Sequence, residues 1–202
     1  MTLSPPKPRE HLHTRRVECE GFAREDGLWD IDGRLTDQKT YGFENRWRGA
    51  IEAGTPVHDM RVRLTLDNKF IVQDIEVEMA AAPFQCCASP PADFRKLIGL
   101  SVGPGWNRRV AELVGGLQGC THVTEVLGRM AMAAFQTIPM ELYRRAKQAA
   151  EGNAENLRAM LTKGGRKPYF IDGCHTWRAD GETVKEEFPE IYTGPKDTDQ
   201  RS

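Results

Sequence analysis

The sequence lacks the motifs and apolar runs by which several large classes of protein are recognised. No GxGxxG or P-loop pattern follows a predicted strand, so nucleotide binding has no support. No apolar run approaches the roughly 20 residues that a membrane-spanning helix needs. No CxxC pair occurs among the five cysteines, so a structural zinc site of the usual form has no support either. Function must therefore be sought in individual side chains.

The net charge and the N-terminal residues exclude further classes of protein. The formal net charge is -1 over 202 residues, so no global field draws the chain to nucleic acid or to an acidic membrane. The first residues, MTLSPPKPREH, contain no apolar signal core, which predicts a cytoplasmic protein. In that compartment the cysteines would remain free thiols. The adjacent Cys86 and Cys87 are interpreted as two small residues near a turn.

Alternation of polar and apolar residues dominates the N-terminal half. Residues 28–35 alternate with period two, which is typical of a half-buried strand, and residues 15–24 do so more loosely. The clearest pattern covers residues 57–79, where two alternating runs flank a polar turn and predict an antiparallel hairpin. Its buried residues would include Met60, Val62 and Leu64. The Arg and Glu rows on its other face are placed to pair across the strands.

Helical patterns replace strands after Pro83. Short helical runs follow Asp93 and Pro104, and Thr121 can cap a long helix toward Gln148 that we expect to break near Pro139. A weaker helix is expected over residues 153–162. Strands followed by helices predict an α+β fold, with an antiparallel sheet in the N-terminal half packed against C-terminal helices. We expect a flexible arm over residues 1–11, one α+β domain over 12–180, and a loose charged tail over 181–202.

Three of the five histidines lie at the edges of predicted elements, where sites tend to be built. His58 stands at the entry to the strongest strand, in register with its inward face. His122 and Glu125 are three residues apart at the start of the long helix, and such a pair can move protons at neutral pH or bind a metal. His175 follows Cys174. Adjacent residues make a poor nucleophile and base, so His175 is interpreted as lining a pocket.

Residues 37–56 predict a long loop, a feature that is often functional in a compact domain. The loop interleaves aromatic rings with charge, as RNA-binding surfaces do, but the near-neutral net charge weakens that interpretation. A loop that closes over a small apolar ligand is favoured, with Arg46 binding an anionic group. Walls of the pocket are expected from Tyr41 in this loop and from Trp29, Trp47 and Trp106.

Several motifs, in order along the chain, resemble a bacterial family of short single-domain proteins of unknown function. They are EDGLWD (residues 25–30), GRLTD (33–37), PVHDM (56–60), IGL (98–100), GPGW (103–106) and GCTH (119–122). The resemblance covers roughly residues 12–180. It implies little about activity and supplies no functional residues. Members of the family look like companions of catabolic enzymes, which implies a metabolic role.

The sequence thus predicts an enzyme that uses general acid–base chemistry without a nucleotide cofactor, as a lyase, isomerase or hydrolase on a small aromatic or acyl substrate. His58 and His122 would transfer protons to and from a substrate between them, Glu125 would tune His122, and His175 would contribute from the tail. One alternative is a metal-dependent enzyme with these four residues as ligands of zinc or iron. Another is a non-catalytic ligand-binding or accessory protein. The expected partners are a small molecule and, optionally, a second copy of the chain in a homodimer, with neither nucleic acid nor membrane.

Overall fold

The computed structural model describes residues 2–88, 93–149, 167–168 and 170–195 of the chain. Contacts between residues divide the chain into two compact units, residues 1–140 and 141–202. The single domain expected over residues 12–180 crosses this boundary and stays a prediction.

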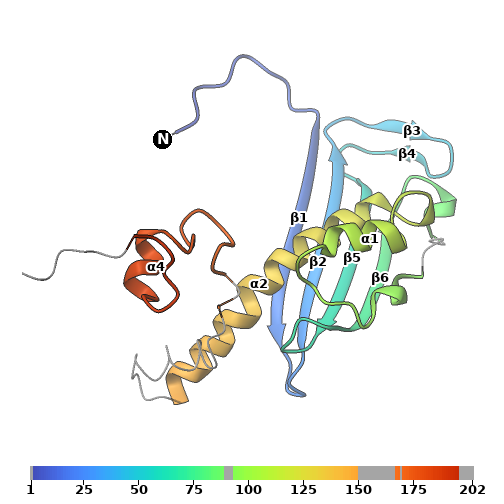
Figure 1. Ribbon diagram of the computed structural model, residues 1–202. Coiled ribbons are helices and arrows are strands. Elements are labelled where there is room, and N and C mark those ends of the chain that lie inside the picture. The colour runs from blue at the N-terminus through green and yellow to red at the C-terminus, as the bar shows by residue number, and fades with distance from the viewer. Residues whose placement is uncertain (1, 89–92, 150–166, 169, 196–202) are drawn as a thin grey trace, which may run out of the picture. The chain divides into compact units, whose positions relative to one another are not determined.

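A four-stranded antiparallel sheet forms the centre of the first unit (Figure 1). Its strand order is β1-β2-β5-β6, and each neighbouring pair runs antiparallel. The expected α+β fold and the expected hairpin are both confirmed. The strands are β1 (His13–Ala23), β2 (Trp29–Lys39), β5 (Pro56–Leu66) and β6 (Val72–Ala81).

A second, two-stranded sheet occupies much of the segment that we expected to be a loop. Strands β3 (Phe43–Asn45) and β4 (Gly49–Ile51) form a small hairpin between β2 and β5. Its turn is closed by Asn45, whose Oδ1 accepts hydrogen bonds from the backbone N–H groups of Trp47 and Arg48. The expectation of a loop over residues 37–56 is therefore wrong in part. The turn that Asn45 caps allows residues 43–45 and 49–51 to pair as antiparallel strands.

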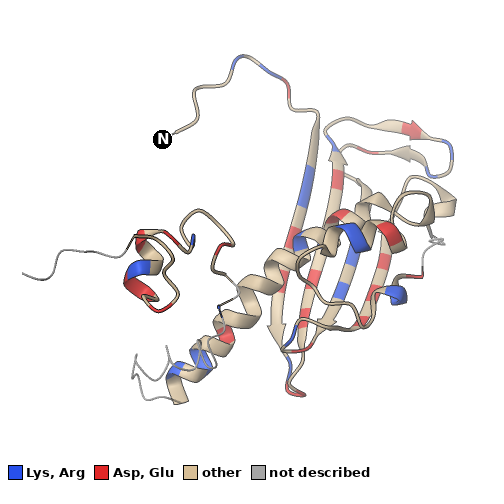
Figure 2. Cartoon of the chain, in the orientation of Figure 1, with Lys and Arg blue, Asp and Glu red and all other residues tan. Residues whose placement is uncertain are grey.

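The two faces of the large sheet have opposite chemistry, as the alternating sequence requires. The inner face is apolar, and Met60 and Leu64 are fully buried there, with Val62 nearly so. Charged residues recur along the strands, as the blue and red bands in Figure 2 show, and those that alternate with the buried residues of β5 and β6 lie on the outer face. On this face Arg61 Nη1 lies 3.3 Å from Glu78 Oε2, which confirms the expected pairing of Arg and Glu across the hairpin.

Helices follow the strands and cover the inner face. Two longer helices, α1 (Trp106–Val114) and α2 (Thr121–Ala149), accompany three short 3-10 helices, η1 (Gln85–Ala88), η2 (Phe94–Leu97) and η3 (Gly116–Gln118). Helix α2 continues through Pro139, so the expected break does not occur. Its apolar stripe stays packed as far as Ile138, which offsets the hydrogen bond that proline removes. The helix expected over residues 153–162 lies outside the described residues. Over the described part of the chain, no helix has both the length and the apolar character required to cross a bilayer.

A glycine in β2 allows α2 to approach the sheet closely. A Cβ atom on Gly33 would lie 2.6 Å from Val126 Cγ1 and 2.7 Å from Met130 Sδ, distances that real side chains do not adopt. Trp106 of α1 in turn donates from Nε1 to the backbone oxygen of Leu127 in α2. Together these contacts fix the position of the first turns of α2 against the sheet.

The second unit has a small core of its own. Helix α4 (Glu182–Glu187) carries the fully buried Val184, which packs with Ile171, Ala179 and Phe188. The rings of Phe170, Trp177 and Phe188 lie within 6.1 Å of one another, centroid to centroid. Residues 182–188 are therefore not the loose tail that their charge suggested. Val184 and Phe188, four residues apart, lie on one face and supply the apolar contacts.

Candidate functional site

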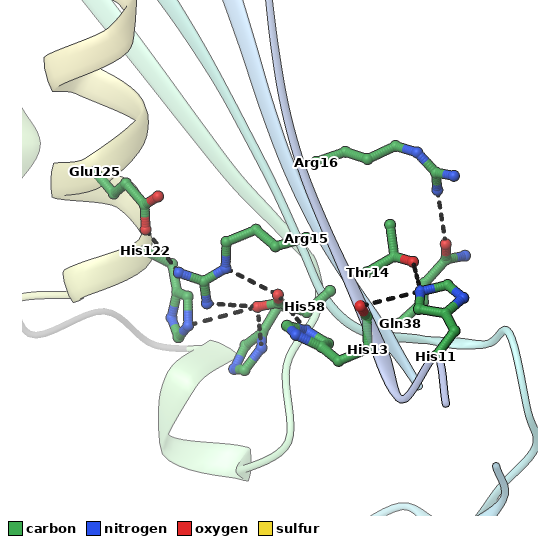
Figure 3. A network of polar contacts seen from close by, with 10 residues as sticks. His11, His13, Thr14, Arg15, Arg16, Gln38, His58, His122 and Glu125 are labelled. Carbon is green, nitrogen blue, oxygen red and sulfur yellow. Dashed lines mark hydrogen bonds and ion pairs between the residues drawn. The ribbon is translucent and has the colours of Figure 1, made fainter. Parts of the chain in front are cut away.

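A row of polar side chains crosses three strands at one end of the inner face. Arg15 of β1 pairs with Asp37 of β2, and Asp37 pairs with His58 of β5. Residues opposite one another on adjacent antiparallel strands bring their side chains within contact distance on the same face. The register of the sheet therefore places a guanidinium, a carboxylate and an imidazole side by side, and Figure 3 shows Arg15 and His58 within this polar network.

Asp37 is the centre of this row and is 3% exposed. Its Oδ1 accepts from His13 Nε2 at 2.8 Å and from Arg15 Nε at 2.9 Å. Its Oδ2 lies 2.8 Å from Arg15 Nη2 and 3.0 Å from His58 Nδ1. Four donor contacts converge on one buried carboxylate, so the cluster is ordered around a single negative charge.

The first two turns of α2 add His122 and Glu125 to the cluster. The ring of His122 lies 3.9 Å from the ring of His58, centroid to centroid, at an interplanar angle of 31°. His122 Nε2 is 3.8 Å from Asp37 Oδ2, which is close enough for electrostatic attraction but too long for a hydrogen bond. Glu125 Oε2 accepts from Arg15 Nη1 at 2.7 Å. Glu125 thus holds Arg15, whereas we expected it to tune His122.

The surroundings shift the protonation of Asp37 and His58. Burial alone would favour the neutral form of Asp37, but the hydrogen bonds and charge of Arg15, with His13 and His58, hold its pKa at about 2. Burial, and then the neighbouring His122, lower the pKa of His58, and the Asp37 carboxylate only partly opposes this shift. Near neutral pH the cluster therefore combines an ionised Asp37 with an uncharged His58.

Cys120 extends the cluster at the start of α2. Its Sγ lies 3.8 Å from His122 Nδ1, the nitrogen on the far side of the ring from Asp37. Burial opposes ionisation of this thiol, but the contact with His122 and the backbone N–H groups of Val123 and His122 outweigh it and lower its pKa. Cys120 is one of five cysteines, all of which are free thiols.

Two tryptophans expected to line a pocket are instead part of the core. Trp29 is 2% exposed and donates from Nε1 to Asn68 Oδ1. Trp106 is 3% exposed and bonds to Leu127 as described above. Both are packed on all sides, so neither offers a wall to a ligand. The alternation that placed Trp29 in phase with Ile31 already indicated an inward side chain.

The aromatic residues of the β3–β4 segment remain exposed. The guanidinium of Arg46 lies 5.1 Å from the ring centroid of Trp47, and that ring meets Phe84 edge to face at 5.2 Å. Tyr41 is 48% exposed and contacts Phe43. None of these described contacts reaches Asp37. Roles for Arg46, Trp47 and Tyr41 in ligand binding therefore stay predictions.

His175 lies in the second unit and is exposed. Its contribution to a site therefore also stays a prediction. The structure thus brings together two of the three expected histidines, His58 and His122, with Glu125 beside them.

Asp37, Arg15, His13 and Cys120 belong to the cluster but were not singled out in the sequence. A signal existed for the first three. Asp37 continues the period-two inner face of β2, two residues beyond the fully buried Leu35. His13 and Arg15 continue the inner face of β1 in the same way. Charged residues in phase with a buried apolar row are unusual and indicate a built polar site.

Three residues of the cluster present side-chain atoms that can bind a metal ion. One ligand atom each from Asp37, His58 and His122 lies within 4.8 Å of the other two. The same groups can instead exchange protons with a small molecule. Glu125 is engaged with Arg15, so it does not complete the ligand set that we expected.

Comparison with known proteins gives a family but no activity. A family model described as "Protein of unknown function (DUF2889)" matches residues 13–136, which span the whole four-stranded sheet and most of the part of α2 that packs on it. No curated protein matches the chain, and no solved structure does.

Proposed function

The chain belongs to a family of proteins of unknown function (DUF2889), and we propose that it is a small-molecule enzyme whose chemistry is proton transfer at the Asp37–His58–His122 cluster. The observation that carries this proposal is the hydrogen bond between His58 Nδ1 and Asp37 Oδ2, with a second imidazole 3.9 Å away. A buried carboxylate that orients a histidine is a recurrent arrangement in general acid–base catalysis.

The bond to Asp37 assigns His58 a tautomer. With the proton on Nδ1, the Nε2 atom of the neutral ring carries the free lone pair and can act as a base. The lowered pKa of His58, caused first by burial and then by His122, keeps this ring uncharged near neutrality. The side chains of His58 and His122 are 17% and 22% exposed, so a small ligand can reach the ring edges.

The distance between the rings changes the expected mechanism in one respect. A substrate cannot lie between two rings whose centroids are 3.9 Å apart. We therefore propose that it approaches the ring edges from one side, with His58 as the base. His122 then acts as a second polar contact to the same reacting region.

The reaction class proposed is that of a lyase or isomerase, with a hydrolase as an alternative, acting on a small aromatic or acyl compound. We place the protein in the cytoplasm, where its five free thiols would stay reduced. We also propose a catabolic role and a homodimeric state. Sedimentation of the purified chain would show whether it forms a dimer.

Hydrogen exchange tests this function without knowledge of the natural reaction. The protein is incubated in D2O with a panel of small aromatic and acyl carbonyl acids, and deuterium incorporation is followed by mass spectrometry. We expect exchange into at least one compound, lowered roughly 10²–10⁴-fold by His58→Gln. His11→Gln is the matched control, because His11 is exposed and bonds to Thr14 and the His13 backbone rather than to Asp37. Equal exchange in wild type and His58→Gln, or none with any compound, would contradict the proposal.

A further inference from the structure

Beyond proton transfer, we propose that Asp37, His58 and His122 bind a divalent transition-metal ion, zinc or ferrous iron, in a two-histidine, one-carboxylate site. This inference rests on the proposed function, because it names an ion that would take part in the same reaction. The three residues come from β2, β5 and the start of α2, elements whose buried apolar residues belong to one core.

The spacing of the donor atoms fits such an ion. Ligand atoms around a four-coordinate ion with bonds of about 2.1 Å lie about 3.4 Å apart. Asp37 Oδ2 is 3.0 Å from His58 Nδ1 and 3.8 Å from His122 Nε2, values on either side of that separation, and one ligand atom from each of the three residues lies within 4.8 Å of the other two. An ion bound at His58 Nδ1 would displace the proton from that nitrogen to Nε2 and leave the ring neutral, so in the metal-bound form a water on the ion, and not His58, would act as the base. Two imidazoles and one carboxylate suit zinc or iron better than calcium or magnesium, which prefer oxygen ligands.

The remaining contacts supply the partners that usually surround metal ligands. Histidine and carboxylate ligands are commonly held by further hydrogen bonds that fix their orientation. Here Asp37 Oδ1 accepts from His13 and Arg15, and His122 Nδ1 faces Cys120 Sγ. Oδ2 also accepts from Arg15 Nη2, and a carboxylate oxygen has a second lone pair for an ion.

The charge of the cluster also favours a dication. The carboxylates of Asp37 and Glu125 and the guanidinium of Arg15 sum to a charge of -1, and imidazoles that bind a metal do so as neutral ligands that add no charge. A divalent ion carrying a hydroxide would bring this to zero. The ligand set is open, because three protein atoms leave at least one position for water or substrate, as in catalytic metal sites.

Metal binding can be measured directly on the full chain, purified without a histidine tag and stripped with a chelator. Titration with Co²⁺, followed by visible absorption and calorimetry, should give one ion per chain. Elemental analysis after loading with Zn²⁺ should give the same stoichiometry. His122→Gln should weaken Co²⁺ binding by more than the roughly 10–100-fold that loss of an outer partner causes. His11→Gln should leave it unchanged.

Further variants keep the result decisive. Asp37→Asn can impair folding, because Arg15 would lose its buried partner, so His122→Gln and His58→Gln carry the test. Binding that survives both histidine substitutions but disappears in Cys86→Ser/Cys87→Ser, with a sulfur-to-cobalt charge-transfer band, would overturn the inference. So would the absence of 1:1 binding in the wild type.

The two proposals fail separately, since ion binding is measured without substrate. A stripped protein that still exchanges substrate protons in a His58-dependent way, and binds no ion, contradicts the metal site alone. A protein that binds one ion at these residues but exchanges no protons contradicts the proposed function alone.

Discussion

Two buried carboxylates on opposite faces of the same sheet make the most informative comparison in this protein. Asp37 on the inner face and Asp59 on the outer face are 3% and 6% exposed. Each accepts two hydrogen bonds from one arginine, Asp37 from Arg15 and Asp59 from Arg34. Their other neighbours differ, because Asp59 meets a second arginine, Arg61, whereas Asp37 meets histidines.

The difference separates a surface ion-pair network from a candidate site. Around Asp59 the arginines are about half exposed and always charged, so the group is a fixed salt-bridge network. Around Asp37 the partners His13, His58 and His122 carry imidazoles, the side-chain group that commonly serves in proton transfer and as a metal ligand. A buried carboxylate with an arginine is therefore insufficient evidence of function, and the nearby histidines are the distinguishing feature.

The largest expected effect is on activity. Asp37→Asn should lower His58-dependent proton exchange by roughly 10²–10⁴-fold, because the amide no longer fixes the His58 tautomer or supplies the negative charge. Asp59→Asn is the matched control and should leave exchange nearly unchanged. The measurement is deuterium incorporation in folded protein, with circular dichroism establishing the folded fraction. Equal losses in both variants would show that the two carboxylates do not differ in function.

The second effect is on stability in acid. The pKa of Asp37 is held at about 2, below the roughly 3.9 of an unfolded aspartate, so its ionised form stabilises the fold above pH 4. This contribution, about 2–3 kcal/mol, should decline as pH falls through 4 toward 2. Urea unfolding of chelator-treated wild type and Asp37→Asn at several pH values measures it. A stability difference that stays constant from pH 7 to pH 2 would contradict the assigned environment.

The third effect concerns how α2 holds His122 over the sheet. Gly33→Ala should destabilise the protein by about 1–3 kcal/mol, because the added Cβ overlaps Val126 and Met130. Thr36→Val, on the outer face of the same strand, should change stability by about 0.5 kcal/mol or less. Denaturant midpoints give both values. Full stability in Gly33→Ala would mean that α2 is free to shift away from the sheet.

The smallest effect is expected on the outer face. A double-mutant cycle of Arg61→Ala and Glu78→Ala should give a coupling of about 0.2–1 kcal/mol, because both side chains are largely solvated. The coupling should shrink further in high salt, as exposed charge pairs are screened. A large coupling that is independent of salt would remove the contrast between the two faces.

The sequence determined much of the fold because its signals are local. Alternation with period two specified the strands and their buried faces, including Met60, Val62 and Leu64 in the hairpin. It also placed His58 on the inward face, because a strand's side chains point alternately to either side. The spacing of His122 and Glu125 placed both at the start of α2.

Tertiary structure alone decided which polar residues meet. Whether Asp37 faces Arg15 and His58 depends on the register of three strands, and register is set by packing and turns rather than by any one segment. The approach of His122 to His58 depends on the close contact of α2 with Gly33. The alternation along β2 indicates that Trp29 points inward, but only the packing of the elements decides that Trp29 and Trp106 belong to the core and do not line a pocket. Alternation along a strand is a local property, so the sequence is enough to predict it. The site consists of residues that are far apart in sequence, and they come into contact only when the strands and α2 pack together.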